Sequence, residues 1–201
     1  VTIKKVECKE KSEKPPALYD LTTLQRDANR LLGFTAQQTL DYLQSLYEKK
    51  LCTYPRTDSR YLTGDMADSL PVLVNLVASA MPFRKGIAIT CDPHTVINDK
   101  KVTDHHAVIP TRNLKDADLS ALPAGEKAVL ELVALRLLCA VAQPHIYSET
   151  VVIAACAGRE FTAKGKTVKH HGWKALEDAY RAKMKDAEPK KTRAQRKPCR
   201  S

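Results

Sequence analysis

Strand-forming segments lie at both ends of the 201-residue chain, and strongly helical sequence lies between them. Residues 1–8 alternate apolar and polar side chains, as an exposed strand does. After Pro144 the period changes again, and residues 146–156, 159–163 and 167–171 have the composition of short strands separated by glycines. The most economical topology pairs residues 1–13 with the strands after residue 146. We therefore expect an α+β fold in which a mainly helical domain is inserted into a small β-rich domain.

Two amphipathic helices are predicted early in the central region. Each begins with a capping box, Thr22-x-x-Gln25 and Thr35-x-x-Gln38, in which hydroxyl and amide side chains satisfy free backbone donors. Gly33 marks the end of the first helix. A helix, a short turn and a second helix predict a helix-turn-helix arrangement. The side chains expected to face inward are Leu24, Ala28, Leu31 and Leu32 in the first helix and Leu40, Leu43, Leu46 and Tyr47 in the second.

Domain boundaries follow from composition. The pair Pro15-Pro16 separates the first strand from the helices. We expect a short strand at residues 87–90, a long buried helix at residues 124–143 and a last helix from Trp173 to about Tyr180. The predicted units are residues 14–145 for the helical domain, residues 1–13 and 146–182 for the β-rich domain, and residues 183–201 for a basic flexible tail.

The net charge of +10 favours polyanionic partners, but most of it lies in that tail. Between residues 183 and 200 there are eight Lys or Arg against two acidic residues, so the tail carries +6. Such a tail is more often a solvated end than a specific reader of nucleic acid. The rest of the chain is only mildly basic.

The six cysteines are scattered and form no C-x-x-C pair, which argues against a zinc ribbon and against a disulfide framework. We expect reduced thiols inside a cell. The sequence contains no signal peptide and no apolar run of transmembrane length, so no membrane partner is expected. Because the sequence opens within a strand pattern at Val1, without a methionine, we expect an excised piece of a longer protein.

A first polar cluster lies in residues 51–62, directly after the second helix. Pro55 pushes the residue before it into extended backbone, so Tyr54, Arg56 and Asp58 should share one face. A phenol oxygen can attack a phosphorus atom, while a neighbouring guanidinium binds the phosphate and offsets the developing charge. An isolated Tyr-x-Arg is, however, far more often a structural tyrosine beside a surface arginine.

A second polar cluster, residues 103–111, contains His105 and His106. Adjacent histidines in extended backbone point to opposite faces, so the pair is poorly arranged to bind one metal ion. Each alone is more often a structural histidine. A phosphate contact becomes the better interpretation only if this segment lies beside Tyr54.

Two other classes of enzyme with a tyrosine nucleophile are excluded by residues that are missing. Tyrosine recombinases need a His-x-x-Arg, and neither His105 nor His106 has an arginine three residues later. Rolling-circle relaxases need two histidines separated by one apolar residue, and the chain has no such triplet.

The segment Thr53-Tyr54-Pro55-Arg56-Thr57-Asp58-Ser59 closely resembles the active-site tyrosine segment of type IA DNA topoisomerases. The segment Asp104-His105-His106-Ala107-Val108-Ile109-Pro110-Thr111 resembles the second motif of that family, and both are most similar to the bacterial topoisomerase III branch. Residues 21–35 also resemble the family's lead-in to the tyrosine. The resemblance covers residues 1–176 and not the tail.

This resemblance implies that Tyr54 is the nucleophile, which cleaves one DNA strand and forms a transient 5′-phosphotyrosyl bond. It matches Arg56 to the arginine that positions the scissile phosphate and His105 to the histidine near that phosphate. It also implies a winged-helix-like domain inserted into a β-rich arch domain. The polar neighbours expected to support the site or contact DNA are Thr53, Thr57, Asp58, Ser59, Arg60 and His106.

The family completes this site with a Toprim domain, which supplies a glutamate, a lysine and an acidic cluster that binds Mg²⁺. None of these is in the chain. We therefore expect a monomer that has no metal site of its own, binds single-stranded DNA weakly and does not relax supercoils alone. Its other partner would be the Toprim domain, and its location the cytoplasm, at the nucleoid. The alternative is a non-catalytic helix-turn-helix DNA-binding module; a purely structural scaffold ranks last.

Overall fold

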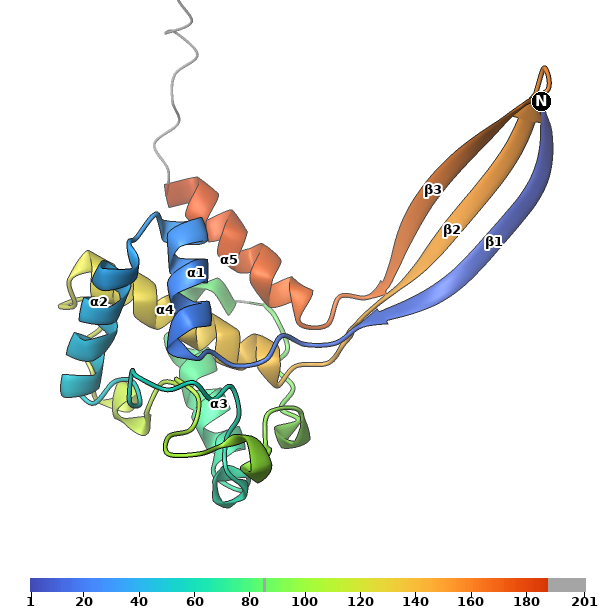
Figure 1. The fold of residues 1–201 in the computed structure, drawn as a ribbon. Helices are drawn as coiled ribbons and strands as arrows, with labels where there is room; N and C mark the ends of the chain where they lie inside the picture. The colour runs from blue at the N-terminus through green and yellow to red at the C-terminus, as the bar shows by residue number, and fades with distance from the viewer. Residues whose placement is uncertain (85, 188–201) are drawn as a thin grey trace, which may run out of the picture.

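The computed structural model describes residues 1–84 and 86–187, which form a helical body and a long three-stranded arm (Figure 1). Short 3₁₀ turns and irregular segments connect the helices of the body. The elements are β1 (Thr2–Glu13), α1 (Leu21–Leu32), α2 (Ala36–Glu48), α3 (Leu70–Ala80), α4 (Ala124–Ala140), β2 (His145–Cys156), β3 (Arg159–His170) and α5 (Lys174–Ala187). No helix among these is long and apolar enough to cross a membrane.

The arm is an antiparallel sheet in the order β1-β2-β3. Strand β1 pairs with β2 from Thr2 opposite Ala155 to Glu13 opposite His145, which confirms the predicted pairing between the two ends of the chain. Strand β3 is continuous where we expected two strands. Gly165 lies in register opposite Thr150, so this glycine weakens the strand without breaking the ladder.

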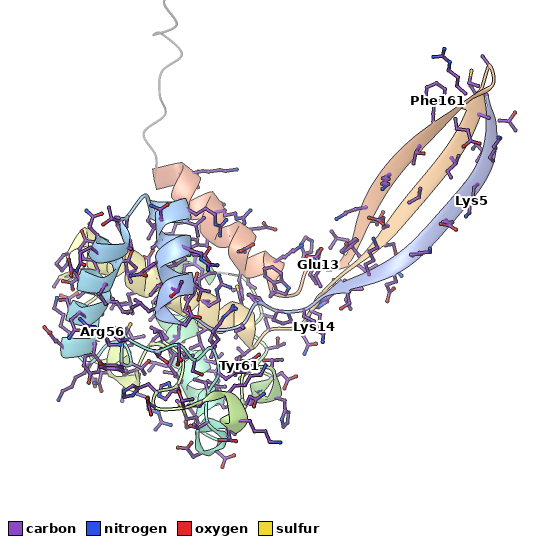
Figure 2. All side chains as sticks on the ribbon, in the orientation of Figure 1. Lys5, Glu13, Lys14, Arg56, Tyr61 and Phe161 are labelled. Carbon is purple, nitrogen blue, oxygen red and sulfur yellow. The ribbon has the colours of Figure 1, made fainter. Side chains whose placement is uncertain are left out.

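The two faces of the arm differ in charge. Cross-strand partners share a face, so Ile3, Ala154 and Phe161 lie together on one side near the tip. The opposite face carries most of the charged side chains, which form ion pairs such as Lys5–Glu7 and Lys11–Glu149. Figure 2 shows Lys5 and Phe161 on the outer part of the arm, away from the helical body.

Helix α4 is the centre of the helical body. Most of its side chains are buried, because α1, α2, α3 and α5 pack around it. This confirms the predicted burial, although α4 ends at Ala140 and not at residue 143. Helix α5 continues through Ala187, beyond the end predicted near Tyr180, and packs against α4. Residues 188–201 of the predicted basic tail lie outside the described residues, and the proposed domain boundaries stay predictions.

The start of α1 differs from the predicted capping box. Asp20 is the N-cap: its carboxylate accepts a hydrogen bond of 2.6 Å from the Thr23 backbone N–H and another of 2.7 Å from the Thr23 hydroxyl. The expected pair Thr22–Gln25 was wrong, because a carboxylate placed two residues earlier caps the helix instead. The second box is confirmed, since Thr35 and Gln38 bond each other reciprocally.

The strand predicted at residues 87–90 is also wrong. The segment belongs to no strand or bridge of the described chain. Ile87 and Ile89 are partly buried against the core instead. The alternating apolar residues of this segment pack one side of it against the core. They form no strand, because a strand also needs a neighbouring strand for its backbone hydrogen bonds.

A partly buried polar network joins α1 to α4 in the body. The Tyr19 hydroxyl donates to Asp27 over 2.8 Å, and Arg136 forms an ion pair with the same carboxylate. Arg136 also lies over the Tyr19 ring, with its guanidinium carbon 4.3 Å from the ring centroid. The Tyr19 carbonyl accepts the Val108 N–H over 2.8 Å, so this network also anchors the second polar cluster.

Candidate active site

The two polar clusters lie side by side in the structure, although about fifty residues separate them in the sequence. Cys52 forms an isolated bridge with Pro110. One residue further on, the Thr53 N–H donates to the Ile109 carbonyl over 3.0 Å. The Thr53 hydroxyl donates to the Ala107 carbonyl over 3.1 Å and accepts the Ile109 N–H over 3.0 Å. These bonds fix the residue before Tyr54 against the residues after His106.

Two more hydroxyls continue this attachment. Thr57 donates to the His105 carbonyl over 2.8 Å, and Ser59 donates to the Lys101 carbonyl over 2.9 Å. Both side chains are buried. Hydroxyls buried on one side of the segment attach it to the second cluster without a regular ladder, and the backbone bends at Pro55 and Arg56.

The predicted alternation of side chains is nevertheless present. Pro55, Thr57 and Ser59 are buried, whereas Arg56 and Asp58 are exposed. Tyr54 is partly buried at the edge of this surface. Figure 2 shows Arg56 on the helical body, far from the arm. The structure therefore places the phenol, the guanidinium and the carboxylate on the outer side of the segment.

The ring of Tyr54 is held by two other rings. Its centroid lies 4.2 Å from that of His105, with an angle of 36° between the ring planes. On α2, Tyr47 meets Tyr54 edge-on, with centroids 5.5 Å apart and an angle of 85°. The Tyr54 hydroxyl makes no hydrogen bond to any described residue, so it is free to meet a substrate.

A hollow of about 500 Å³ opens beside His105. Three segments of the chain meet there: the start of α1, the residues after Pro55 and the residues before His106. Among the described residues, Arg56 has no hydrogen-bond or ion-pair partner, so its guanidinium is available to an anion. The lining residues are Asp20, Leu21, Thr22, Arg56, Thr57, Asp58, Thr103, Asp104 and His105.

Two of the predicted supporting residues, Arg60 and His106, contact backbone carbonyls of the body. The Arg60 guanidinium donates through Nε to the Leu18 carbonyl over 3.1 Å and ties the segment to the start of the body. His106 is partly buried, with its Nδ1 atom 2.8 Å from the Ala107 carbonyl, and it is not part of the hollow. His105, in contrast, is exposed and lines the hollow. The two adjacent histidines thus have different environments.

Sequence reasoning missed Tyr47 and Asp104 as members of this surface. Tyr47 was expected to face inward on α2, but it is 39% exposed and contacts Tyr54. Tyr47 lies four residues after Leu43, so helical periodicity predicted that it would share the buried face of Leu43. Asp104 belongs to the second cluster and lines the hollow, yet the sequence offered no partner that would have assigned it a role.

Cys52 is the nearest thiol in sequence to Tyr54, and it is buried. Burial raises the pKa of the Cys52 thiol to about 12. A thiol with so high a pKa stays protonated near neutral pH and is a poor nucleophile. Cys52 is therefore not a candidate nucleophile at this surface.

No group of three or more His, Cys, Asp or Glu side chains within residues 1–84 and 86–187 is placed to hold a metal ion. A second hollow of about 380 Å³ lies where the arm joins the body, between residues 87–90 and the end of β3. Its lining is mainly apolar and does not include Tyr54, Arg56 or His105.

Comparison with known proteins gives one consistent result. Residues 1–197 match the sequence profile of the family described as DNA topoisomerase. DNA topoisomerase 3 of Bacillus licheniformis is 45% identical over 171 residues, which cover 81% of this chain and 23% of that protein. DNA topoisomerase 3 of Bacillus subtilis is 45% identical over 172 residues, with the same coverage. The chain thus spans about a quarter of the length of these curated relatives.

A solved structure shares the fold. Full-length topoisomerase I from Thermotoga maritima superposes with a TM-score of 0.67, covering 88% of this chain and 29% of the other. The two sequences are 23% identical over the match. The fold of this chain is therefore found in another solved protein.

Proposed function

The chain belongs to the type IA DNA topoisomerases, and on that premise we propose that it carries the nucleophile half of a strand-cleaving site within a longer polypeptide. The Tyr54 oxygen attacks a phosphodiester of one DNA strand and forms a 5′-phosphotyrosyl bond. The bond from phosphorus to the 3′ oxygen breaks, and that oxygen leaves with the electron pair and takes up a proton. Attack by the freed 3′-hydroxyl later reverses the reaction, after another strand has passed through the break.

The observation that carries this proposal is the contact between the Tyr54 and His105 rings beside the hollow that Arg56 lines. A nucleophile, a cation and an imidazole from two separate motifs thus share one exposed surface. We place the scissile phosphate in this hollow, beside Arg56 and His105, because the ring of Tyr54 lies against the ring of His105. No comparable observation favours the non-catalytic helix-turn-helix module.

Arg56 is proposed to bind the scissile phosphate. Its planar guanidinium can donate two parallel hydrogen bonds to phosphate oxygens. Since no described carboxylate pairs with it, it need not break an existing ion pair to do so. Its charge offsets the additional negative charge of the pentacovalent transition state.

His105 is proposed to contact the same phosphate or the leaving 3′ oxygen. Its ring nitrogens make no hydrogen bond to a described residue, whereas His106 lies against a backbone carbonyl. The Thr57 bond to the His105 carbonyl holds this residue in place. Thr53, Asp58 and Ser59 complete the support of the segment, and Arg60 anchors its far end.

Among the described residues, no group is hydrogen-bonded to the Tyr54 hydroxyl and so placed to remove its proton. A phenol ordinarily titrates near pH 10, so the reaction requires help at neutral pH. The described residues offer no cluster suited to Mg²⁺. We assign metal binding to a Toprim domain elsewhere in the longer protein, and we propose that the 201-residue chain alone does not relax supercoiled DNA.

The remaining properties follow from the same proposal. Helices α1 and α2, joined by the Gly33 turn, would form the helix-turn-helix of a winged-helix-like domain, and the arm would belong to a β-rich arch. The substrate would be single-stranded DNA, the protein a monomer, and its location the cytoplasm, at the nucleoid.

The test uses the full-length protein with Tyr54→Phe. We expect no covalent DNA adduct and no relaxation, because the substitution removes only the attacking oxygen. Tyr42→Phe is the matched control, since Tyr42 lies on α2 in an edge-on contact with Phe34 and away from Tyr54. Cleavage by the Tyr54→Phe protein at the wild-type rate would refute the assignment.

A further inference from the structure

The described interactions of the Tyr54 side chain are two ring contacts, one with His105 and one with Tyr47. Its hydroxyl has no hydrogen bond among the described residues, and its backbone lies in a segment without regular secondary structure. His105 covers part of the ring, but His105 is itself exposed. The second contact comes from Tyr47, which lies on helix α2.

Tyr47 lies in the last turn of α2, which is firmly attached to the body. Leu43 and Leu46 on the same helix are fully buried. Two residues after Tyr47, Lys49 forms an ion pair with Glu126 of α4, and Ser45 donates to the same carboxylate over 2.9 Å. Tyr47 is thus carried by a rigid element, whereas Tyr54 lies on a loop.

The chain reversal after α2 is fixed as well. Lys50 adopts a positive φ of 57°, a conformation that a lysine rarely takes without support. Its carbonyl accepts hydrogen bonds from the side chains of Thr111 and Asn113. These bonds connect the end of α2 to the second polar cluster, so Tyr47, Tyr54 and His105 are held in one frame.

The exposure of Tyr47 argues against a role in the core. It is 39% exposed, and its hydroxyl has no hydrogen-bond partner among the described residues. The core tyrosines of this chain are much more deeply buried, since Tyr19 and Tyr180 are each 1% exposed. At this position the ring of Tyr47 makes a perpendicular contact with the ring of Tyr54.

We propose that Tyr47 is a positioning residue for the nucleophile: its ring restricts the rotamers of Tyr54 and so directs the phenol oxygen toward the hollow. The proposal rests on Tyr54 being the nucleophile. Holding reacting atoms in an attack geometry lowers the barrier, and a small displacement of either atom is costly. Only the ring of Tyr47 is needed for this role, and its hydroxyl is not.

The first test measures whether the Tyr47 ring contacts Tyr54 in solution, without any enzymatic reaction. Fluorotyrosine at position 54 of the 201-residue protein reports its ring environment by ¹⁹F NMR. We expect Tyr47→Leu to shift and change the width of this resonance, while Tyr47→Phe leaves it near the wild-type position. Tyr42→Leu, on the same helix, is the control that should leave it unchanged. An unchanged resonance in Tyr47→Leu would overturn the proposal.

The second test measures single-turnover cleavage of a single-stranded oligonucleotide by the full-length protein. We expect Tyr47→Leu to lower the cleavage rate at saturating DNA roughly five- to tenfold, in keeping with the strength of an aromatic pair, with little change in DNA affinity. Tyr47→Phe should restore the rate. Equal loss in Tyr47→Leu and Tyr42→Leu would indicate general destabilisation and contradict the proposal.

Tyr54→Phe separates failure of this inference from failure of the proposed function. If Tyr54→Phe is inactive and Tyr47→Leu cleaves at the wild-type rate, the positioning role is wrong and the nucleophile stands. If Tyr54→Phe still cleaves, the proposed function itself is wrong, and the positioning role falls with it.

Discussion

The ring of Tyr54 lies against the ring of His105, with 4.2 Å between their centroids, and each comes from a different motif of the sequence. The contact depends on the hydroxyls of Thr53 and Thr57, which attach one motif to the other. Arg56, on the same segment as Tyr54, has no hydrogen-bond or ion-pair partner among the described residues.

Replacing His105 with phenylalanine removes the ring nitrogen atoms and keeps an aromatic ring against Tyr54. We expect His105→Phe to keep the packing against Tyr54 but to lower single-turnover cleavage about 100-fold, because the polar contact to the phosphate or leaving oxygen is lost. His106→Phe is the control, since His106 lies outside the hollow. A larger effect of His106→Phe than of His105→Phe would contradict our assignment.

Arg56→Ala should lower cleavage about 100-fold through loss of transition-state stabilisation. Arg56→Lys should recover only part of this rate, because an ammonium group lacks the paired donors of a guanidinium. The exposed Arg26, which has no hydrogen-bond or ion-pair partner among the described residues, provides the control variant Arg26→Ala. The rates are measured at saturating oligonucleotide, and wild-type cleavage by Arg56→Ala would exclude the proposed phosphate contact.

Thr53→Val should destabilise the 201-residue protein by about 1–3 kcal/mol. The substitution removes the acceptor for the buried Ile109 N–H and leaves this donor without a partner. Urea unfolding followed by circular dichroism measures the change. Thr63→Val is the control, because the Thr63 side chain makes no capping hydrogen bond. Equal stabilities of the two variants would show that the attachment between the motifs is weak.

The network around Asp27 should make stability depend on acid pH. Burial opposes ionisation, but hydrogen bonds from Arg30 and Tyr19 and the charge of Arg136 outweigh it and hold the pKa of Asp27 below its ordinary value of 3.8. A carboxylate with a lowered pKa stabilises the fold fully above the unfolded-state value, and this contribution is lost as the pH falls through the folded-state value.

We therefore expect Asp27→Asn to be less stable than wild type at pH 7, with the difference shrinking as the pH falls below 3.8. Urea unfolding at a series of pH values measures this difference. Asp41→Asn, at an exposed position on α2, serves as the control. A difference that grows toward low pH would contradict the sign of the shift.

The sequence predicted the parts of the fold that depend on local pattern. The pairing of the chain ends follows from strand periodicity, and the Thr35 cap and the Gly33 stop follow from local hydrogen bonding. The cap of α1 was missed because Asp20 and Thr22 are both acceptable N-caps, and only the path of the preceding chain selects one. The strand predicted at residues 87–90 failed because a strand depends on a neighbour that the local sequence does not reveal.

In the candidate site, too, local pattern predicted some features, and contacts between distant segments determined the others. The shared face of Tyr54, Arg56 and Asp58 follows from the extended backbone around Pro55. The position of His105 against Tyr54 depends on long-range hydrogen bonds of Thr53 and Thr57, which spacing alone does not predict. Tyr47 was placed in the core because a helical period cannot tell a buried aromatic residue from one that packs on another surface side chain.

The central claim is tested most directly by locating the covalent bond between protein and DNA. The full-length protein is trapped with a single-stranded oligonucleotide, digested with trypsin, and the DNA-linked peptide is sequenced by mass spectrometry. Our account predicts a single modified residue, Tyr54, joined to the 5′ phosphate of the cleaved strand. A bond to any other residue, or to a 3′ phosphate, would contradict it.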